Sequence, residues 1–424
     1  MRPRVLILLQ NEPIPHDRHV WNEARALVRG GYDVTVICPA GEKRDNEPYV
    51  ELEGVKIHRY RPRPAGEHAA EYAVEYGAAL ISMRRLAARL ARERPFDIVH
   101  ACSPPDFLLL AALKLRRQGA RFVFDHHDLT PELYSTRYGE GLVQKATLLA
   151  EQVAYRSADV ILAVNDSYRR IAIERGRRDP ADVAVVRTGP DLSRFVPVKP
   201  DPALRRGKRH LLSYVGVMGP QDGVDHALRA LAELAARRQD WHAIFMGDGD
   251  VVDEMRTMSG ELGLGDLVEF SGWVEHDTIA AVLSTSDVCI APDPKNPLND
   301  LSSMIKISEY MAMARPIVSF DLAESRVGAG GAALFAAPED FAGFADRISQ
   351  LLDDPERRRV LGDAGRRRAE EVLAWEHQER ALLAAYQRAL SMGPVREGRI
   401  ALLRRLLLPR RSPQVAMPAA SLAR

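Results

Sequence analysis

One stretch of the chain decides the fold: NDLSSMIKISEYMA at residues 299–312, followed directly by MARPIVSF at 313–320. A polar loop with two serines opens a predicted helix, and a proline then leads into an apolar, β-branched strand. The first N–H groups of a helix lack intrahelical partners and carry the positive end of its dipole, so they favour a phosphate. Lys306 and Glu309 share a helix face, where they could contact a phosphate and a ribose diol. An ordinary capped helix with a surface lysine and glutamate fits the same residues.

Short apolar runs alternate with longer amphipathic ones along the rest of the chain, which is typical of parallel sheets wrapped by helices. A first helix is predicted to start with Asp17 as its N-cap and to end at Gly30-Gly31. The stretch 191–207 is rich in proline and charge and has the composition of a linker. The predicted strands fall on either side of it, at 5–9, 34–38, 98–101, 122–124, 160–164 and 183–186, and at 211–215, 243–246, 268–270, 288–291, 317–320 and 332–335. The fold class is therefore α/β, with two domains in tandem.

Composition narrows the class of protein. The formal net charge of +1 gives no field that favours nucleic acid, so no nucleic-acid partner is expected. The three cysteines lie in apolar runs without metal-ligand spacing, which favours a reduced, cytoplasmic protein. The apolar run at 5–9 is too short for a signal peptide, and no run reaches the roughly 20 apolar residues of a spanning helix.

The segment EYMAMARPIV at 309–318 resembles the donor-site helix of family-4 retaining glycosyltransferases. Further segments match that family in order and spacing: GYDVTVI at 31–37, DIVH at 97–100, HD at 127–128, YVGVMGPQDGVD at 214–225, IFMGDG at 244–249 and VEFSGWV at 268–274. The resemblance implies a GT-B fold, two Rossmann-like domains facing across a cleft. It implies an acceptor-side domain at 1–195, a nucleotide-sugar-binding domain at 205–375, a helix crossing back to the first domain at 376–392, and a tail at 393–424.

The resemblance also implies a site. His127 would contact the donor sugar, and Val274 would read the nucleobase through its backbone. Glu309 would hold the ribose. The remaining donor-binding residues would be the turn glycines Gly216, Gly219 and Gly247 and the helix-start residues Ser303, Met304 and Ile305. No cofactor and no metal are expected.

The sequence departs from the family pattern at the diphosphate. Val217 and Asp222 stand where an arginine and a lysine are usual, and Leu301 replaces the first glutamate of the usual pair. A diphosphate leaving group needs positive charge or oriented donors as the glycosidic bond breaks. Lys306 is therefore predicted to be a relocated cation with a catalytic role, and Asn299 or Asp300 could replace the missing carboxylate. A divergent active enzyme and a catalytically weakened relative both fit these changes.

Two other classes of site fit less well. The first strand-to-helix turn holds no G-x-G-x-x-G, which removes the main support for a dinucleotide-binding dehydrogenase. The run Asp125-His126-His127-Asp128 raises the question of a metal. Adjacent side chains of an extended chain point to opposite faces, so His126 and His127 are not expected to share an ion.

Two basic amphipathic stretches could contact anionic lipid. The stretch at 83–92 is read as a sheet-covering helix with a solvated face. The stretch at 399–411 lies beyond the expected fold, so it is predicted to contact a membrane surface or a partner, and the chain end is predicted to be partly disordered. The predicted location is cytoplasmic, with peripheral attachment to the inner face of the membrane.

The sequence thus predicts a retaining, metal-independent glycosyltransferase that moves a sugar from a nucleotide diphosphate donor to a glycan, a lipid-linked acceptor or a small molecule. A noncatalytic GT-B subunit that binds a sugar nucleotide or supports a partner enzyme is the alternative.

Overall fold

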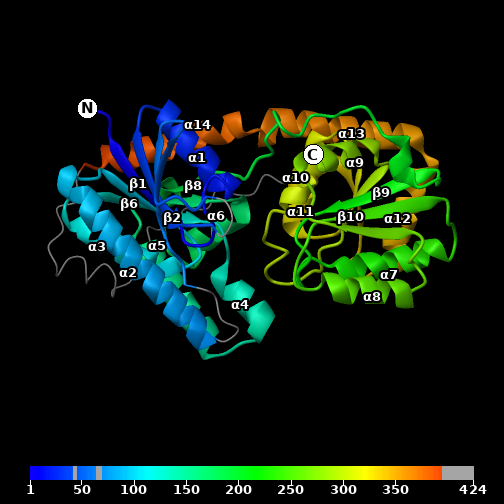
Figure 1. Ribbon diagram of the computed structural model, residues 1–424, viewed down its shortest axis with the longest axis horizontal. Helices are drawn as coiled ribbons and strands as arrows, with labels where there is room; N and C mark the ends of the chain where they lie inside the picture. Colours follow the sequence, from blue (N-terminus) through cyan, green and yellow to red (C-terminus); the bar gives the residue numbers. More distant parts are fainter. Residues whose placement is uncertain (42–44, 64–68, 394–424) are drawn as a thin grey trace, which may run out of the picture. The chain divides into compact units, whose positions relative to one another are not determined.

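The computed structural model describes residues 1–41, 45–63 and 69–393. These residues form two compact units, each built on its own sheet (Figure 1). Of the described residues, unit 1 comprises those within Met1–Val186 and 379–393, and unit 2 comprises Arg187–Gln378. The stretch 191–207 is ordered within unit 2 and is not a free linker: Val198 and Asp201 donate backbone N–H groups to Ser284 and Thr285.

The sheet of unit 1 has eight strands in the order β3-β4-β2-β1-β5-β6-β7-β8. Every neighbouring pair is parallel except the hairpin of β3 and β4. The register places Val5 opposite Val34 and Ile98, so β1 lies at the centre. The strands are β1 (Arg4–Leu8), β2 (Asp33–Pro39), β3 (Tyr49–Leu52), β4 (Val55–Tyr60), β5 (Ile98–Cys102), β6 (Arg121–His126), β7 (Val160–Ala163) and β8 (Val183–Val185).

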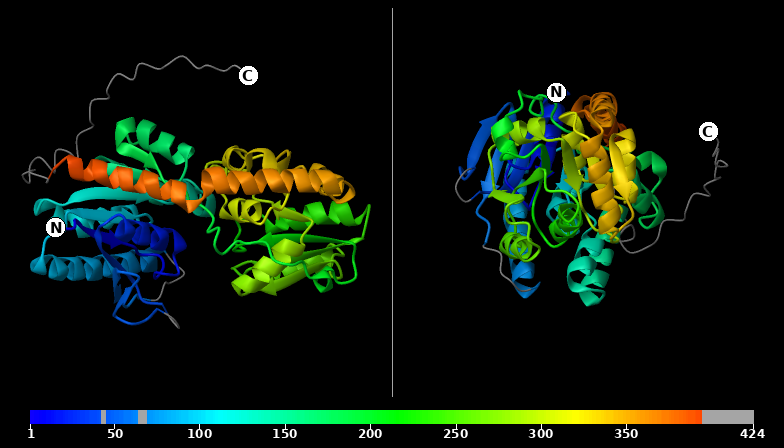
Figure 2. Two further views of the ribbon diagram at one scale, coloured as in Figure 1. Left: turned by 90° about the horizontal axis from the view of Figure 1, so that it is seen from above. Right: turned by 90° about the vertical axis from the view of Figure 1, so that its right-hand side faces the viewer.

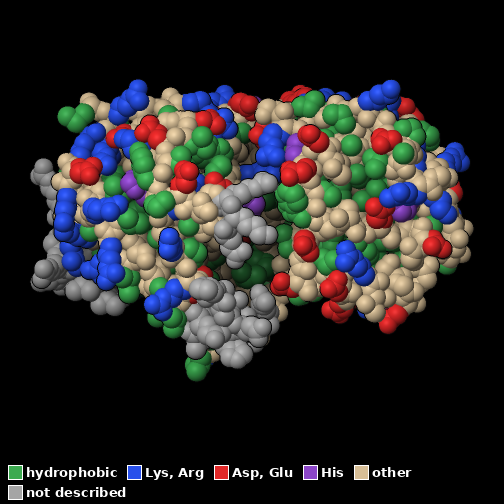
Figure 3. Space-filling model, viewed as in Figure 1, with side chains coloured by type: hydrophobic (Ala, Val, Ile, Leu, Met, Phe, Trp, Pro, Cys, Tyr) green, Lys and Arg blue, Asp and Glu red, His purple; other side chains and the backbone are tan. Residues whose placement is uncertain are grey.

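The helices of unit 1 cover this sheet and include one from the far end of the chain. They are α1 (Arg18–Arg29), α2 (Ala69–Glu93), α3 (Leu109–Arg117), α4 (Thr130–Tyr138), α5 (Leu142–Ser157), α6 (Asp166–Glu174) and α14 (Trp375–Ser391), whose course Figure 2 follows. Asp17 caps α1 by accepting from the Val20 N–H, and Gly30 ends it, as predicted. The stretch 83–92 also behaves as predicted, since Met83 and Leu90 are buried while the arginines of α2 face outward (Figure 3).

Helix α14 is tied to unit 1 along its length. Arg388 contacts Asp182 at 2.6 Å, and Glu379 contacts Arg29 at 2.6 Å. Leu383 packs so closely on Gly30 that a Cβ added there would lie 2.4 Å from its Cδ2. These contacts join residues 206 and 350 positions apart in the chain, and the last described helix is part of the first unit from Glu379 onward.

The sheet of unit 2 has six parallel strands in the order β11-β10-β9-β12-β13-β14. Its strands are β9 (His210–Val215), β10 (Trp241–Met246), β11 (Val268–Gly272), β12 (Val288–Ala291), β13 (Ile317–Phe320) and β14 (Ala333–Ala336). Its helices are α7 (Val224–Ala235), α8 (Val252–Glu261), α9 (His276–Thr285), α10 (Ile305–Ala312), α11 (Ala323–Ala329), α12 (Phe341–Asp353) and α13 (Pro355–Arg368). Apolar residues of the strands are packed against helices on both faces, which explains why these runs are apolar throughout.

Candidate donor site

The strand order of unit 2 defines where a ligand can bind. Counted along the chain it reads 3-2-1-4-5-6, the doubly wound order of Rossmann-type domains. The strand order changes direction between β9 and β12, and this position is called the switch point of the sheet. Ligands of such sheets bind outside the carboxyl ends of the strands at the switch point. Gly216 follows β9 and Asp293 follows β12, so the sequence motifs of unit 2 converge there.

Two glycine turns pack backbone against backbone at this edge. Gly247, with φ +136°, would place a Cβ only 1.9 Å from the Gly216 carbonyl oxygen. Gly216 donates its N–H to Met246, and Gly247 donates to Gly272, which extends the pairing beyond the strands. Only glycine fits at 247, so this residue shapes the floor of the site.

Gly219 and Asp222 form the next turn. The N–H of Gly219 donates to Asp222 Oδ2 at 3.0 Å. Gly223 then begins α7 with φ +70°, and a Cβ there would lie 2.3 Å from the carbonyl oxygen of Pro292. The turn after β9 is therefore fitted against the chain leaving β12.

Lys306 reaches this switch point from the first turn of α10. Its side chain is buried, and its Nζ lies 2.7 Å from Asp293 Oδ1 and 3.9 Å from Asp222 Oδ1. Its Cε lies 3.4 Å from the position of a Cβ on Gly216, and its Nζ lies 4.9 Å from the centre of the Tyr214 ring. The lysine is thus no surface residue, and it is placed beside the glycine turn that the sequence assigned to the donor.

The charges around Lys306 decide what it can do. Burial opposes its charged form, but Asp293, Tyr214 and Asp222 outweigh burial and raise its pKa. Burial raises the pKa of Asp222, against the influence of Lys306 and of the Gly219 N–H. One ammonium between two carboxylates leaves no surplus positive charge when both carboxylates are ionised. Sequence reasoning missed Asp293, whose only signal is its place between Pro292 and Pro294 at a strand's carboxyl end.

Helix α10 begins at Ile305 with Met304 as its N-cap, and no side chain of the described residues caps it. Ser303, Met304 and Ile305 therefore lie at its N-terminus, where N–H groups favour an anion. Glu309, one turn further, is part-exposed, and Val274 follows the end of β11. The structure brings Gly216, Gly247 and Lys306 into one cluster.

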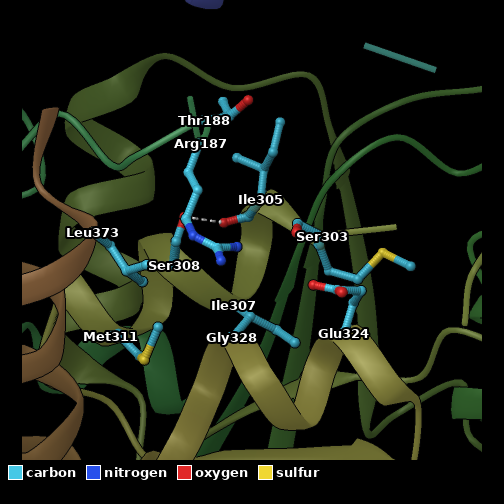
Figure 4. Close-up of a pocket in the computed structure, with 11 residues that line it drawn as sticks. Arg187, Thr188, Ser303, Ile305, Ile307, Ser308, Met311, Glu324, Gly328 and Leu373 are labelled. Atoms are coloured by element: carbon cyan, nitrogen blue, oxygen red, sulfur yellow. Dashed lines mark hydrogen bonds between the residues drawn. The ribbon is translucent and has the colours of Figure 1, made fainter. Parts of the chain in front are cut away.

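A pocket opens on another face of α10 (Figure 4). It is lined by Ser303, Met304 and Ile305 but not by Lys306 or Glu309, and a hydrogen bond from Ser308 Oγ to the Ile305 carbonyl joins two of its lining residues. Its other lining residues are a mixture of polar and apolar residues: Arg187, Thr188, Ile307, Ser308, Met311, Glu324, Gly328 and Leu373. The start of α10 therefore borders both this pocket and the switch point.

Asn299 and Asp300 have structural partners. The side-chain amide of Asn299 donates to the carbonyls of Gln221 and Pro294, each at 2.9 Å. Asp300 Oδ1 accepts from the N–H of Ala323 at the start of α11, at 2.8 Å. Both residues shape the loop before α10. Arg315 likewise donates to the carbonyls of Ser284 and Ser286 near the end of α9.

His127 lies in unit 1 at the carboxyl end of β6. Its Nε2 contacts Asp125 Oδ2, and its ring meets that of His19 edge-on, with the centroids 4.4 Å apart. Burial opposes the charged form of His127, but Asp125 raises its pKa to about 10. Its backbone N–H donates to Ser103 Oγ.

His126 faces a different set of side chains, as the alternation of a strand predicts. Its Nδ1 contacts the hydroxyl of Tyr155 at 3.1 Å, and its Nε2 lies 3.7 Å from Glu151. Burial is the main reason that the pKa of His126 falls to about 3. His126 and His127 therefore belong to separate clusters.

Two families of known proteins match the chain. Residues 17–194 match the model described as "Glycosyltransferase Family 4", and residues 209–354 match "Glycosyl transferases group 1". The MMP alpha-(1->4)-mannosyltransferase of Mycolicibacterium hassiacum is 25% identical over 411 residues, which cover 88% of this chain and 94% of the relative. The alpha-D-kanosaminyltransferase of Streptomyces kanamyceticus is 29% identical over 157 residues, and the match spans only 39% of that relative.

Solved structures match along nearly the whole chain. Sucrose-phosphate synthase from Thermosynechococcus elongatus has a TM-score of 0.76 at 18% identity, covering 92% of this chain and all of the other (100%). Anabaena HepE in complex with UDP-glucose has a TM-score of 0.70 at 17% identity, covering 91% of this chain and 99% of the other. These likenesses confirm the predicted GT-B fold class.

The fold and the family matches together define the class: this chain is a glycosyltransferase of the GT-B fold. In the described part of the chain, no helix is both long enough and apolar enough to cross a membrane. The tail at 399–411 lies outside the described residues.

Proposed function

We propose that this enzyme is a retaining glycosyltransferase, a divergent relative of family 4, that takes its sugar from a nucleotide diphosphate donor. The acceptor is a glycan, a lipid-linked molecule or a small molecule. Domain 205–375 binds the donor and domain 1–195 takes the acceptor. The names of the relatives support this range, since they include a mannosyltransferase, a glycogen synthase and a 2-deoxystreptamine glucosyltransferase.

One observation carries the proposal: the start of α10 and the paired turns at Gly216 and Gly247 meet at the switch point of a doubly wound sheet. A diphosphate is bound by backbone N–H groups and by the N-terminus of a helix, and glycines let the backbone come close to it. Anabaena HepE, which has the same fold, was solved with UDP-glucose, a donor of this kind.

The donor is held in three parts. Ser303, Met304 and Ile305 bind the diphosphate through their backbone, and Glu309 binds the ribose diol. Val274 reads the base edge, beside the exposed Trp273. The contact of His127 with the donor sugar stays a prediction.

Lys306 acts in this site as half of a buried ion pair. Asp293 fixes its ammonium beside Gly216, so it supplies a local positive charge at one defined place rather than a surplus charge. Since Val217 and Asp222 add no cation, oriented N–H groups provide most of the stabilisation of the leaving diphosphate. The diphosphate is bound without a metal ion.

Turnover with stereochemical analysis tests this function. The purified chain is incubated with nucleotide sugars and candidate acceptors, and ¹H NMR reports the anomeric configuration of the product at early times. Transfer with the configuration of the donor retained is expected. An inverted product would remove the retaining assignment, and binding of a donor without any transfer would instead favour a noncatalytic subunit.

A further inference from the structure

Glu23 on α1 carries a buried carboxylate, and neither of its oxygens has a hydrogen-bond partner among the residues that the structure describes. Its ion contacts are with two histidines, His19 at 3.5 Å and His100 at 3.7 Å. A carboxylate removed from water without hydrogen bonds is costly, and protein interiors compensate such groups with a cation. The two imidazoles compensate Glu23 only when they are protonated, so a bound cation is another way to balance this carboxylate.

We propose that unit 1 binds a divalent transition-metal ion through His19, Glu23, Asp125 and His127. One ligand atom from each of these residues lies within 4.8 Å of all the others. All four ligands belong to unit 1, and the proposal does not depend on the proposed donor chemistry.

The fold explains how these ligands meet. His19 and Glu23 are four residues apart on α1 and so share one face of that helix. Asp125 and His127 are two residues apart at the end of β6, where alternate side chains point the same way. Helix α1 follows β1 at the sheet's own switch point between β1 and β5, and β6 pairs with β5. A helix face and a strand face thus converge on one point.

The chemistry of the four metal ligands indicates which kind of ion they would bind. Two imidazoles and two carboxylates suit Zn²⁺ and related first-row ions, whereas Mg²⁺ and Ca²⁺ prefer oxygen ligands. Outer groups hold the ligands: His100 Nε2 lies 3.1 Å from Asp125 Oδ2, and His100 Nδ1 contacts the Tyr386 hydroxyl of α14. Such partners orient metal ligands and tune their affinity.

The ion would fix the ring of His127. The Nε2 of His127 faces the cluster, so its Nδ1 remains for another hydrogen bond. A metal on Nε2 and a sugar hydroxyl on Nδ1 are therefore compatible roles for one imidazole.

Metal binding by the full chain tests the proposal. Protein stripped with a strong chelator is titrated with Zn²⁺ by calorimetry and with Co²⁺ by visible absorption, and the metal content of untreated protein is measured by mass spectrometry. One saturable site per chain is expected, and Glu23→Gln should weaken it about 100-fold, since even outer partners of metal ligands are worth 10–100-fold.

The matched control is the exposed pair Glu12 and His16, which has the same spacing as Glu23 and His19. Glu12→Gln and His16→Gln should bind the ion like the wild type. If Glu23→Gln does not fold, His19→Gln replaces it. Absence of a saturable site in the wild type, or equal affinity in wild type and the folded variants of Glu23 and His19, would overturn the proposal.

Discussion

Lys306 and Asp293 form a buried ion pair, Nζ to Oδ1 at 2.7 Å, at the switch point of the second sheet. Within the described part of the chain, Asp293 Oδ2 has no hydrogen-bond partner, so the lysine is what compensates this carboxylate. A cation that replaced the arginine and lysine usual in the family would need an unbalanced positive charge to attract the diphosphate. Asp293 already balances much of the charge of Lys306, so the ion pair holds the ammonium beside Gly216 without a large surplus of positive charge.

Lys306→Met should therefore lose stability as well as turnover. Removing one partner of a buried pair costs about 3–5 kcal/mol because the other charge is left uncompensated. The double variant Lys306→Met/Asp293→Asn should regain most of the stability and remain slow. Chemical denaturation and turnover assays of the three proteins separate the two effects. Wild-type turnover in the double variant would remove Lys306 from the mechanism.

Nucleotide-sugar binding should strengthen as the pH falls toward the pKa of Asp222. Burial raises this pKa, and protonation of Asp222 removes a negative charge from the site, so an anion binds better in the acidic range. Calorimetry with a nucleotide sugar, at a series of pH values from neutral into the acidic range, measures the trend. Asp222→Asn should flatten it, and an unchanged pH dependence in that variant would show that Asp222 does not face the ligand.

Gly247→Ala should destabilise unit 2 by about 2–4 kcal/mol, the range typical of large single-residue effects. The cause is a Cβ 1.9 Å from the Gly216 carbonyl oxygen at φ +136°. Gly260→Ala in α8 is the control, because a Cβ there meets nothing within 4 Å. Thermal unfolding compares the two variants. Equal melting temperatures would contradict the close packing of the Gly247 turn on Gly216.

Truncation after Gly393 should abolish binding to anionic vesicles and leave the fold intact. Arg121 donates to the carbonyls of Met392 and Gly393, so the truncated chain keeps the contacts that close unit 1. Basic residues near an anionic surface contribute about 1 kcal/mol each, screened by salt. Vesicle sedimentation at low and high salt is the measurement. Equal binding by both forms would place any membrane contact elsewhere.

The sequence predicted the central strands well because buried parallel strands are continuous apolar runs. It missed the hairpin of β3 and β4, in which β3 is a short, largely exposed strand at the edge of the sheet. It placed the motifs of unit 2 at strand ends but gave Lys306 as a possible surface residue. Periodicity along one helix cannot show that Asp293, from another loop, holds the ammonium.

The same limit applies to unit 1. Glu23 and Asp125 are about a hundred residues apart in the chain and meet only through the sheet order. Sequence reasoning considered a metal for the adjacent pair His126 and His127, and their separation into two clusters is confirmed. The combination that the structure brings together uses α1 instead, and its only local signal was the spacing of His19 and Glu23.

The most direct test of the central claim is calorimetric titration of nucleoside diphosphates, in the presence of EDTA, into the wild type and Glu309→Ala. The account predicts that the wild type binds at least one of them without metal. It also predicts that Glu309→Ala weakens this binding about 10- to 150-fold, since a charged hydrogen bond contributes roughly 1.5–3 kcal/mol. The exposed Glu254→Ala, on α8 of the same unit, should bind like the wild type. Equal affinity in Glu309→Ala, or binding that requires added Mg²⁺ or Mn²⁺, would contradict the proposed donor site.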